Sequence, residues 1–135
     1  MVTFGRKLPI GIQTFSDIRT QGYLYVDKTA LVWQIANAGK PFFLSRPRRF
    51  GKSLLLSTFE AYFEGKKELF EGLAIEKLEE KWEKHPVLHL DLNARKYVCA
   101  EDLIAMLNQF LENWESIYGA EKQDRAPEER LGYII

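Results

Sequence analysis

The sequence predicts an α/β fold in which helices flank a parallel sheet. Two short, mostly apolar runs, residues 42–44 and 87–93, have the character of buried strands. Segments with helical spacing of their apolar residues separate and follow these runs, and the first run leads directly into a loop and a helix. Strands that alternate with helices in this way are typical of βαβ units.

The first helix is predicted between Asp27, which is suited to cap its N-terminus, and Gly39, which is suited to end it. Pro41 prevents that helix from continuing, so the apolar residues 42–44 are predicted to form a strand that is buried on both faces. The residues expected to face inward from the helix are Leu31, Val32, Ile35 and Ala38.

A second helix is predicted at 53–64, with Gly65 as its end, and a helical stretch over 69–85 is ended by Pro86. Residues 87–93 form the second predicted strand, and a long helix at 99–118 stops near Gly119. A parallel sheet of two strands would leave open edges and bury little apolar surface. We therefore expect residues 1–135 to be the N-terminal part of a larger domain, with the final "LGYII" leading into a further element.

Composition excludes several classes of protein. The chain is 46% hydrophobic and 28% charged, as a globular domain is, and its 19 basic and 19 acidic residues cancel. This balance gives no reason to expect nucleic acid or an anionic membrane as an obligate partner. A single cysteine, Cys99, cannot make an internal disulfide. No apolar run approaches the roughly 20 residues that cross a bilayer, and the first residues lack the basic-then-apolar pattern of a signal peptide. We therefore expect a cytoplasmic protein with no membrane partner.

Residues 46–53, "RPRRFGKS", have the composition of a phosphate-binding loop between a strand and a helix. The N-terminus of a helix carries unpaired amides and the positive end of the macrodipole. Gly51 would let the backbone approach a phosphate, Lys52 would reach the β- and γ-phosphates, and the Ser53 hydroxyl would bind Mg²⁺. Lys52 is also the candidate catalytic residue. The candidate binding residues are Arg46, Arg48, Arg49, Phe50, Gly51, Lys52, Ser53 and Leu54.

Two other interpretations of this loop stay open. The usual P-loop has glycine at the position of Arg46, where a positive φ would strain an arginine, so the loop entry is expected to take a different path. The loop could instead be a solvated basic turn in which Ser53 caps the helix. Because residues 41–59 contain four basic side chains and no acidic one, a non-enzymatic module that binds nucleic acid or a protein partner is the alternative function.

The stretches "LPIGIQTFSDIRTQGYLYVDKTALVWQI", "FFLSRPRRFGKSLLLSTFEAYFEGKKELFEGLAI" and "PVLHLDLN" resemble the N-terminal part of the bacterial AAA-ATPase-like domain family, whose P-loop is typically RPRRFGKS. The resemblance implies an ASCE-type P-loop NTPase fold, with ATP and Mg²⁺ as ligands and with Lys52 and Ser53 as the phosphate and metal contacts. It also implies that residues 25–29 lie close to the nucleotide. The arginine-proline entry at Arg46 belongs to this family pattern.

Members of the family continue into a Walker B strand that ends in Asp-Glu, and often into a C-terminal PD-(D/E)xK nuclease-like domain that could bind nucleic acid. Asp91 is followed by Leu92 rather than by an acid, so we interpret it as a structural residue at a strand end. Phosphoryl transfer needs a metal, a lysine and a water-positioning group together. We therefore expect this chain to bind ATP, with efficient turnover depending on a Walker B segment beyond it.

Overall fold

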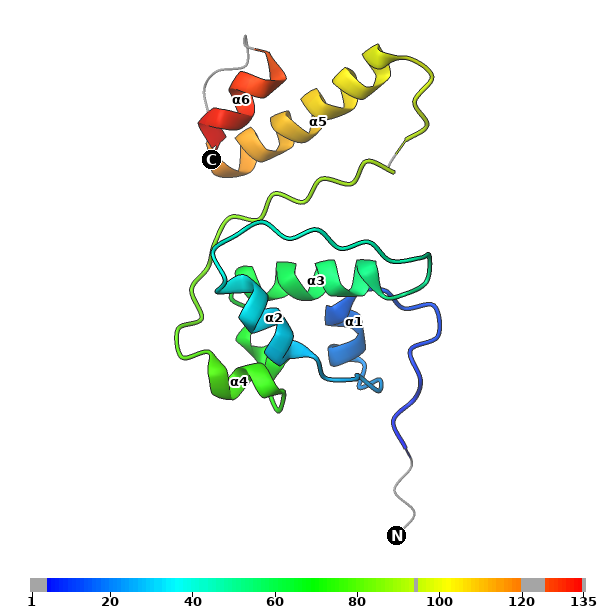
Figure 1. Ribbon diagram of the computed structural model, residues 1–135, viewed down its shortest axis with the longest axis vertical. Helices are drawn as coiled ribbons and strands as arrows, with labels where there is room; N and C mark the ends of the chain where they lie inside the picture. The colour runs from blue at the N-terminus through cyan, green and yellow to red at the C-terminus, as the bar shows by residue number, and fades with distance from the viewer. Residues whose placement is uncertain (1–4, 94, 120–125, 135) are drawn as a thin grey trace. The chain divides into compact units, whose positions relative to one another are not determined.

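The computed structural model describes residues 5–93, 95–119 and 126–134, and every regular element in these ranges is a helix (Figure 1). The chain divides into two compact units, one up to Val87 and one from Leu88. The helices of the first unit are α1 (Phe15–Thr20), α2 (Thr29–Ala36), α3 (Lys52–Phe63), the 3₁₀ helix η1 (Lys67–Phe70) and α4 (Ala74–Leu78). Those of the second unit are α5 (Ala100–Tyr118) and α6 (Pro127–Ile134).

The predicted α/β architecture, a parallel sheet of the P-loop NTPase type, is wrong for the described residues, because none of them lies in a strand. Phe43 is 93% exposed, and Phe42 and Leu44 are 52% and 48% exposed, so this run is not buried on both faces. The physical reason is that a strand needs neighbours to take its amide and carbonyl groups. This sequence offers only two short strand-like runs, whereas its helices satisfy their backbone groups locally.

The predicted helices at 53–64 and 99–118 are confirmed as α3 and α5, and Gly119, with a φ of 76°, is the C-cap that follows α5. The first predicted helix is α2, which ends at Ala36. The continuous helical stretch expected over 69–85 is wrong: η1 and α4 are separated at Gly72, whose φ is 76°, and no described residue from 80 to 86 is helical. Neither α1 nor α6 was predicted.

The core of the first unit joins helices that are distant in the sequence. Phe15 of α1 and Phe70 of η1 are fully buried, with their ring centroids 4.8 Å apart. Arg19 of α1 donates through Nε to the carbonyl of Leu69, at 2.7 Å, which fixes α1 against η1. Other buried members of this core are Val32, Ala61, Leu69, Leu73 and Ile75.

Asp27 connects the starts of two helices. Its Oδ1 accepts hydrogen bonds from the amide and the hydroxyl of Thr29, at 2.9 and 2.6 Å, at the beginning of α2. Its Oδ2 accepts from the amide of Ala74, at 2.7 Å, at the beginning of α4. The buried Thr29 hydroxyl in turn accepts from the amide of Ile75. The N-cap position of α2 is Lys28, without a side-chain cap, so the prediction of Asp27 as the N-cap is wrong by one residue. The Asp27 carboxylate instead binds the first residue of α2 and, 47 residues later in the sequence, the first residue of α4.

In the second unit, α5 and α6 are joined by a buried ion pair. Arg130 donates through Nε and Nη2 to the two carboxylate oxygens of Glu115, at 2.8 and 2.6 Å, and through Nη1 to Asn108 at 3.0 Å. Both charged residues are only 4% exposed. In neither unit does the described part of the chain include a helix with the length and apolar content to cross a membrane.

Candidate functional site

The basic loop of the first unit closes on itself before α3. The Lys52 ammonium donates a hydrogen bond of 2.7 Å to the carbonyl of Arg46, at the entry of the loop. Arg49 has a φ of 65°, and it is the one non-glycine residue with positive φ in the described part of the chain. Gly51 follows with a φ of 76°. The strained position is therefore Arg49 rather than Arg46, where the sequence pattern placed the difficulty.

This backbone conformation exposes amide groups at the start of α3. Backbones that alternate between right- and left-handed conformations form concave nests of amides that bind anions. The first hydrogen bond of α3 runs from the amide of Leu55 to the carbonyl of Gly51, at 2.9 Å, and no side chain caps this end of the helix. Ser53 therefore does not have the capping role that the solvated-turn interpretation gave it, and the amides before Leu55 are oriented for an acceptor from outside the helix.

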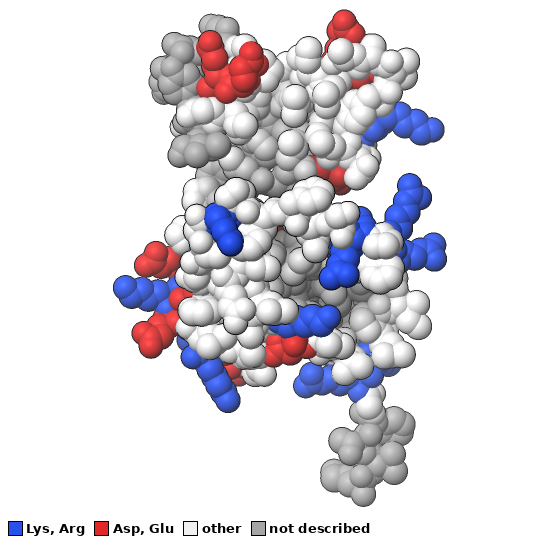
Figure 2. All heavy atoms as spheres, in the orientation of Figure 1, with Lys and Arg blue, Asp and Glu red and all other residues white. Residues whose placement is uncertain are grey.

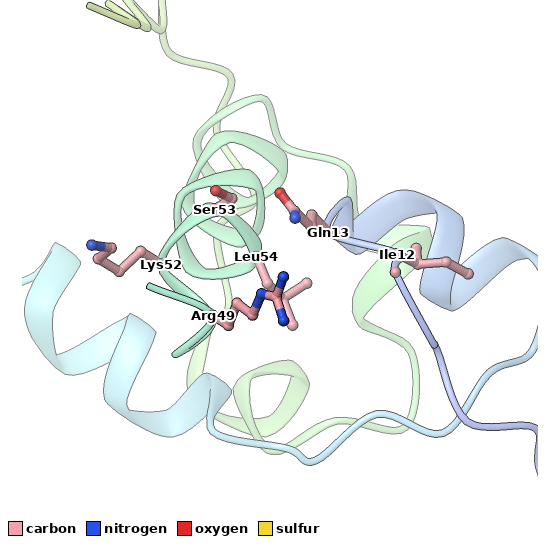
Figure 3. Close-up of a pocket in the computed structure, with 8 residues that line it drawn as sticks. Ile12, Gln13, Arg49, Lys52, Ser53 and Leu54 are labelled. Carbon is pink, nitrogen blue, oxygen red and sulfur yellow. The ribbon is translucent and has the colours of Figure 1, made fainter. Parts of the chain in front are cut away.

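A pocket of about 580 Å³ lies in front of this helix end (Figure 3). That size is within the usual range for small-molecule sites, roughly 300–1,000 Å³. Two segments form its wall, the end of the basic loop and a stretch that precedes α1. The lining residues are Gly11, Ile12, Gln13, Arg49, Gly51, Lys52, Ser53 and Leu54.

Five of the eight predicted binding residues line this pocket: Arg49, Gly51, Lys52, Ser53 and Leu54. Arg46 takes part through its backbone carbonyl, which holds the Lys52 ammonium. Arg48 and Phe50 are exposed and do not line it, and Phe50 is 65% exposed. Residues 25–29 do not line it either, since Asp27 and Thr29 bind the start of α4.

Sequence reasoning missed the segment from Gly11 to Gln13. It lies within the first quoted stretch of the family resemblance, but it has neither charge nor periodic spacing to single it out. Ser57 of α3 holds the chain beside it, because its hydroxyl accepts a hydrogen bond of 2.9 Å from the amide of Phe15. The same hydroxyl lies 2.9 Å from the carbonyl of Leu54 and 3.3 Å from that of Gln13.

The charges of the pocket are those of a site for anions. Arg49 and Lys52 are its charged lining residues, and none of the eight is acidic. Figure 2 shows that basic side chains occupy part of the visible surface without acidic neighbours. The described residues hold no cluster of three or more His, Cys, Asp or Glu that could bind a metal ion by itself. Ser53 is the residue in the pocket whose hydroxyl could contribute one ligand to a Mg²⁺ that phosphate oxygens also bind.

Comparison with known proteins identifies the family. Residues 9–135 match the family model described as "Predicted AAA-ATPase". The chain belongs to the AAA-ATPase-like family. A relative from Azotobacter chroococcum mcd 1, described as "Uncharacterized protein in vnfD 5'region", is 40% identical over 134 residues. This alignment covers 96% of the chain but 25% of the relative, so the chain spans about a quarter of that protein's length. No solved structure matches the chain.

Family membership confirms the resemblance seen in the sequence. The family's description suggests nucleotide binding, and the basic loop within the matched residues contributes five of the eight residues that line the pocket.

Proposed function

We propose that this AAA-ATPase-like chain binds Mg-ATP through residues 46–54. The observation that carries the proposal is the pocket itself, which is lined by the end of the basic loop and by the start of α3. Two residues of that loop, Arg49 and Gly51, have positive φ, and no side chain caps the N-terminus of α3. The amides of Lys52, Ser53 and Leu54 would bind phosphate oxygens, which fits the affinity of helix N-termini for anions.

Each charged or polar group of the loop has a distinct part in this proposal. The Lys52 ammonium would leave the carbonyl of Arg46 and bind the terminal phosphates, and Arg49 would add a second cation from the pocket wall. Ser53 would contribute its hydroxyl to Mg²⁺. Hydrolysis needs a carboxylate for the metal and the attacking water in addition. Because no lining residue is acidic, we expect binding without efficient turnover from these residues alone.

Titration calorimetry with Mg-ATP tests the proposal on the parent chain and on two lysine variants. Lys52→Ala removes one of the two cations that line the pocket. We expect it to weaken ATP binding at least tenfold, because a hydrogen bond to a charged group contributes about 1.5–3 kcal/mol and a tenfold change in affinity corresponds to about 1.4 kcal/mol. The matched control is Lys28→Ala, since Lys28 is also exposed, lies in the same unit and does not line the pocket. We expect this variant to bind as the parent does.

Equal binding by the parent and Lys52→Ala would contradict the proposal. The alternative, a basic loop that binds nucleic acid, predicts that the parent binds an oligonucleotide with an affinity that falls steeply as salt is added, and that Mg-ATP does not compete.

A further inference from the structure

We infer that Ile12 and Gln13 form the nucleoside-binding wall of this pocket, contacting the base and ribose rather than the phosphates. This inference rests on the proposed function, in which the basic loop binds the phosphates, and it adds a separate set of residues for the nucleoside. The wall belongs to the segment before α1, 33 or more residues away from the basic loop in the sequence, and only the fold brings the two together in the pocket.

The first argument is chemical complementarity. A nucleoside triphosphate has one strongly charged end and one uncharged, largely apolar end. The basic loop gives the pocket its cations, Arg49 and Lys52. Ile12 is half-buried and apolar, and Gln13 carries an amide that can both donate and accept hydrogen bonds. An uncharged wall of this kind suits a base and a ribose, whose apolar faces and polar edges need contacts of both types.

The second argument is geometric. In Figure 3, Lys52 and Ile12 lie at opposite ends of the labelled side chains, and the Lys52 ammonium points away from Ile12 and Gln13. A lysine at this position of a phosphate loop reaches the β- and γ-phosphates. When the terminal phosphates lie at Lys52, the chain of phosphates passes the start of α3 and the nucleoside is directed toward Ile12 and Gln13.

Ser57 is the residue that positions this wall. Its hydroxyl accepts from the amide of Phe15, whose ring is fully buried, so the backbone that follows Gln13 is fixed to α3. The same α3 begins at Lys52, within the phosphate-binding loop. One helix thus holds both the anion-binding amides and, through Ser57, the position of the proposed nucleoside wall.

Two ligands with the same charged portion test the inference: Mg-ATP and inorganic tripolyphosphate with Mg²⁺. We expect Ile12→Ala and Gln13→Ala each to weaken ATP binding about three- to tenfold, by loss of an apolar contact or a hydrogen bond. Both variants should bind tripolyphosphate as the parent does. The matched control is Thr14→Ala, because Thr14 is exposed, follows Gln13 directly and does not line the pocket. It should leave both affinities unchanged.

The positioning role of Ser57 is tested by the ratio of the affinity for Mg-ATP to the affinity for Mg-tripolyphosphate. A purely structural role would change both affinities alike and leave this ratio unchanged. We expect Ser57→Ala to lower this ratio of ATP to tripolyphosphate affinity, and Ser57→Thr, which keeps a hydroxyl, to restore it. A general loosening of the fold would weaken the binding of both ligands together.

The possible failures are distinguishable. If Ile12→Ala and Gln13→Ala weaken both ligands equally, or neither, the nucleoside wall is wrong while ATP binding at the loop still holds. If the parent binds neither ligand, or if Lys52→Ala binds both as well as the parent does, the proposed function fails and this inference fails with it.

Discussion

The ammonium of Lys52 donates a hydrogen bond of 2.7 Å to the carbonyl of Arg46, six residues earlier, and so closes the basic loop. This bond is exposed to solvent, where a hydrogen bond contributes little net stability because water competes for both partners. The cation is therefore held in the loop by a contact that a phosphate can replace.

Lys52→Met should open this loop while leaving the fold intact. We expect the free energy of unfolding to change by less than about 1 kcal/mol, since one exposed hydrogen bond is lost. The amides of the loop should exchange with deuterium faster than in the parent, and those of α1 should not change. A large loss of global stability would show that Lys52 has a structural role that its exposed hydrogen bond does not reveal.

Arg49→Gly should stabilise the chain and weaken its affinity for ATP. The left-handed backbone of Arg49, with a φ of 65°, costs about 1–2 kcal/mol for a residue with a Cβ and little for glycine. Glycine also raises the conformational entropy of the unfolded chain, which costs part of this gain. We therefore expect the free energy of unfolding to rise by about 0.5–1 kcal/mol. Chemical denaturation measures the gain. Arg49→Ala is the control, because it removes the same charge but keeps the strain, and it should not be more stable than the parent.

The ion pair of Glu115 and Arg130 should make the second unit sensitive to acid. Hydrogen bonds from Arg130 lower the pKa of Glu115 below its ordinary value of 4.5. Because the pKa of Glu115 is lower in the folded chain than in the unfolded chain, its ionised carboxylate stabilises the folded state at any pH above 4.5. This stabilisation is lost as the pH falls through the pKa of the folded state. Glu115→Gln should abolish this acid dependence and unfold α5 and α6 more easily at neutral pH, by circular dichroism. The exposed Glu112→Gln is the matched control, and an equal effect there would argue against the buried pair as the cause.

Tyr62 should ionise late in an alkaline titration. Burial and a hydrogen bond of 2.5 Å to Glu79 raise its pKa from 10.0 to about 12. The neutral phenol therefore stabilises the fold below pH 10, and this contribution is lost as the pH rises from 10 toward 12. The ultraviolet absorbance of tyrosinate should show a late step that disappears in Tyr62→Phe. A late step of unchanged size in that variant would assign it to another tyrosine, such as Tyr25, whose pKa burial also raises.

Local signals in the sequence were sufficient for some elements and insufficient for others. The periodicity of α3 and α5 and the glycine after α5 predicted both helices, because these depend on interactions within a few residues. The strand interpretation of residues 42–44 failed because a strand depends on partners elsewhere, and composition alone cannot say whether they exist. The helical stretch over 69–85 was predicted from the spacing of Ile75, Leu78 and Trp82, which suggested a continuous helix. The positive φ of Gly72 breaks it between η1 and α4.

The candidate site divides in the same way. Gly51, Lys52 and Ser53 were predicted from their order along the chain, because neighbouring residues carry the chemistry of a phosphate loop. Ile12 and Gln13 could not be predicted, since only the packing of α1 on α3, with Ser57 as a tie, brings them to the pocket. The expectation that residues 25–29 lie close to a nucleotide stays a prediction; Asp27 and Thr29 join α2 to α4, and none of the five lines the pocket.

The carboxylate of Asp27 has a consequence for how the first unit opens. Because one side chain holds the starts of both α2 and α4, neither helix can fray at that end without disturbing the other. The two helices should therefore behave as one cooperative unit, with amides that become accessible to solvent at a common free energy of opening. Asp27 makes no hydrogen bond to the basic loop, so we expect this loop to be able to rearrange while α2 and α4 stay closed.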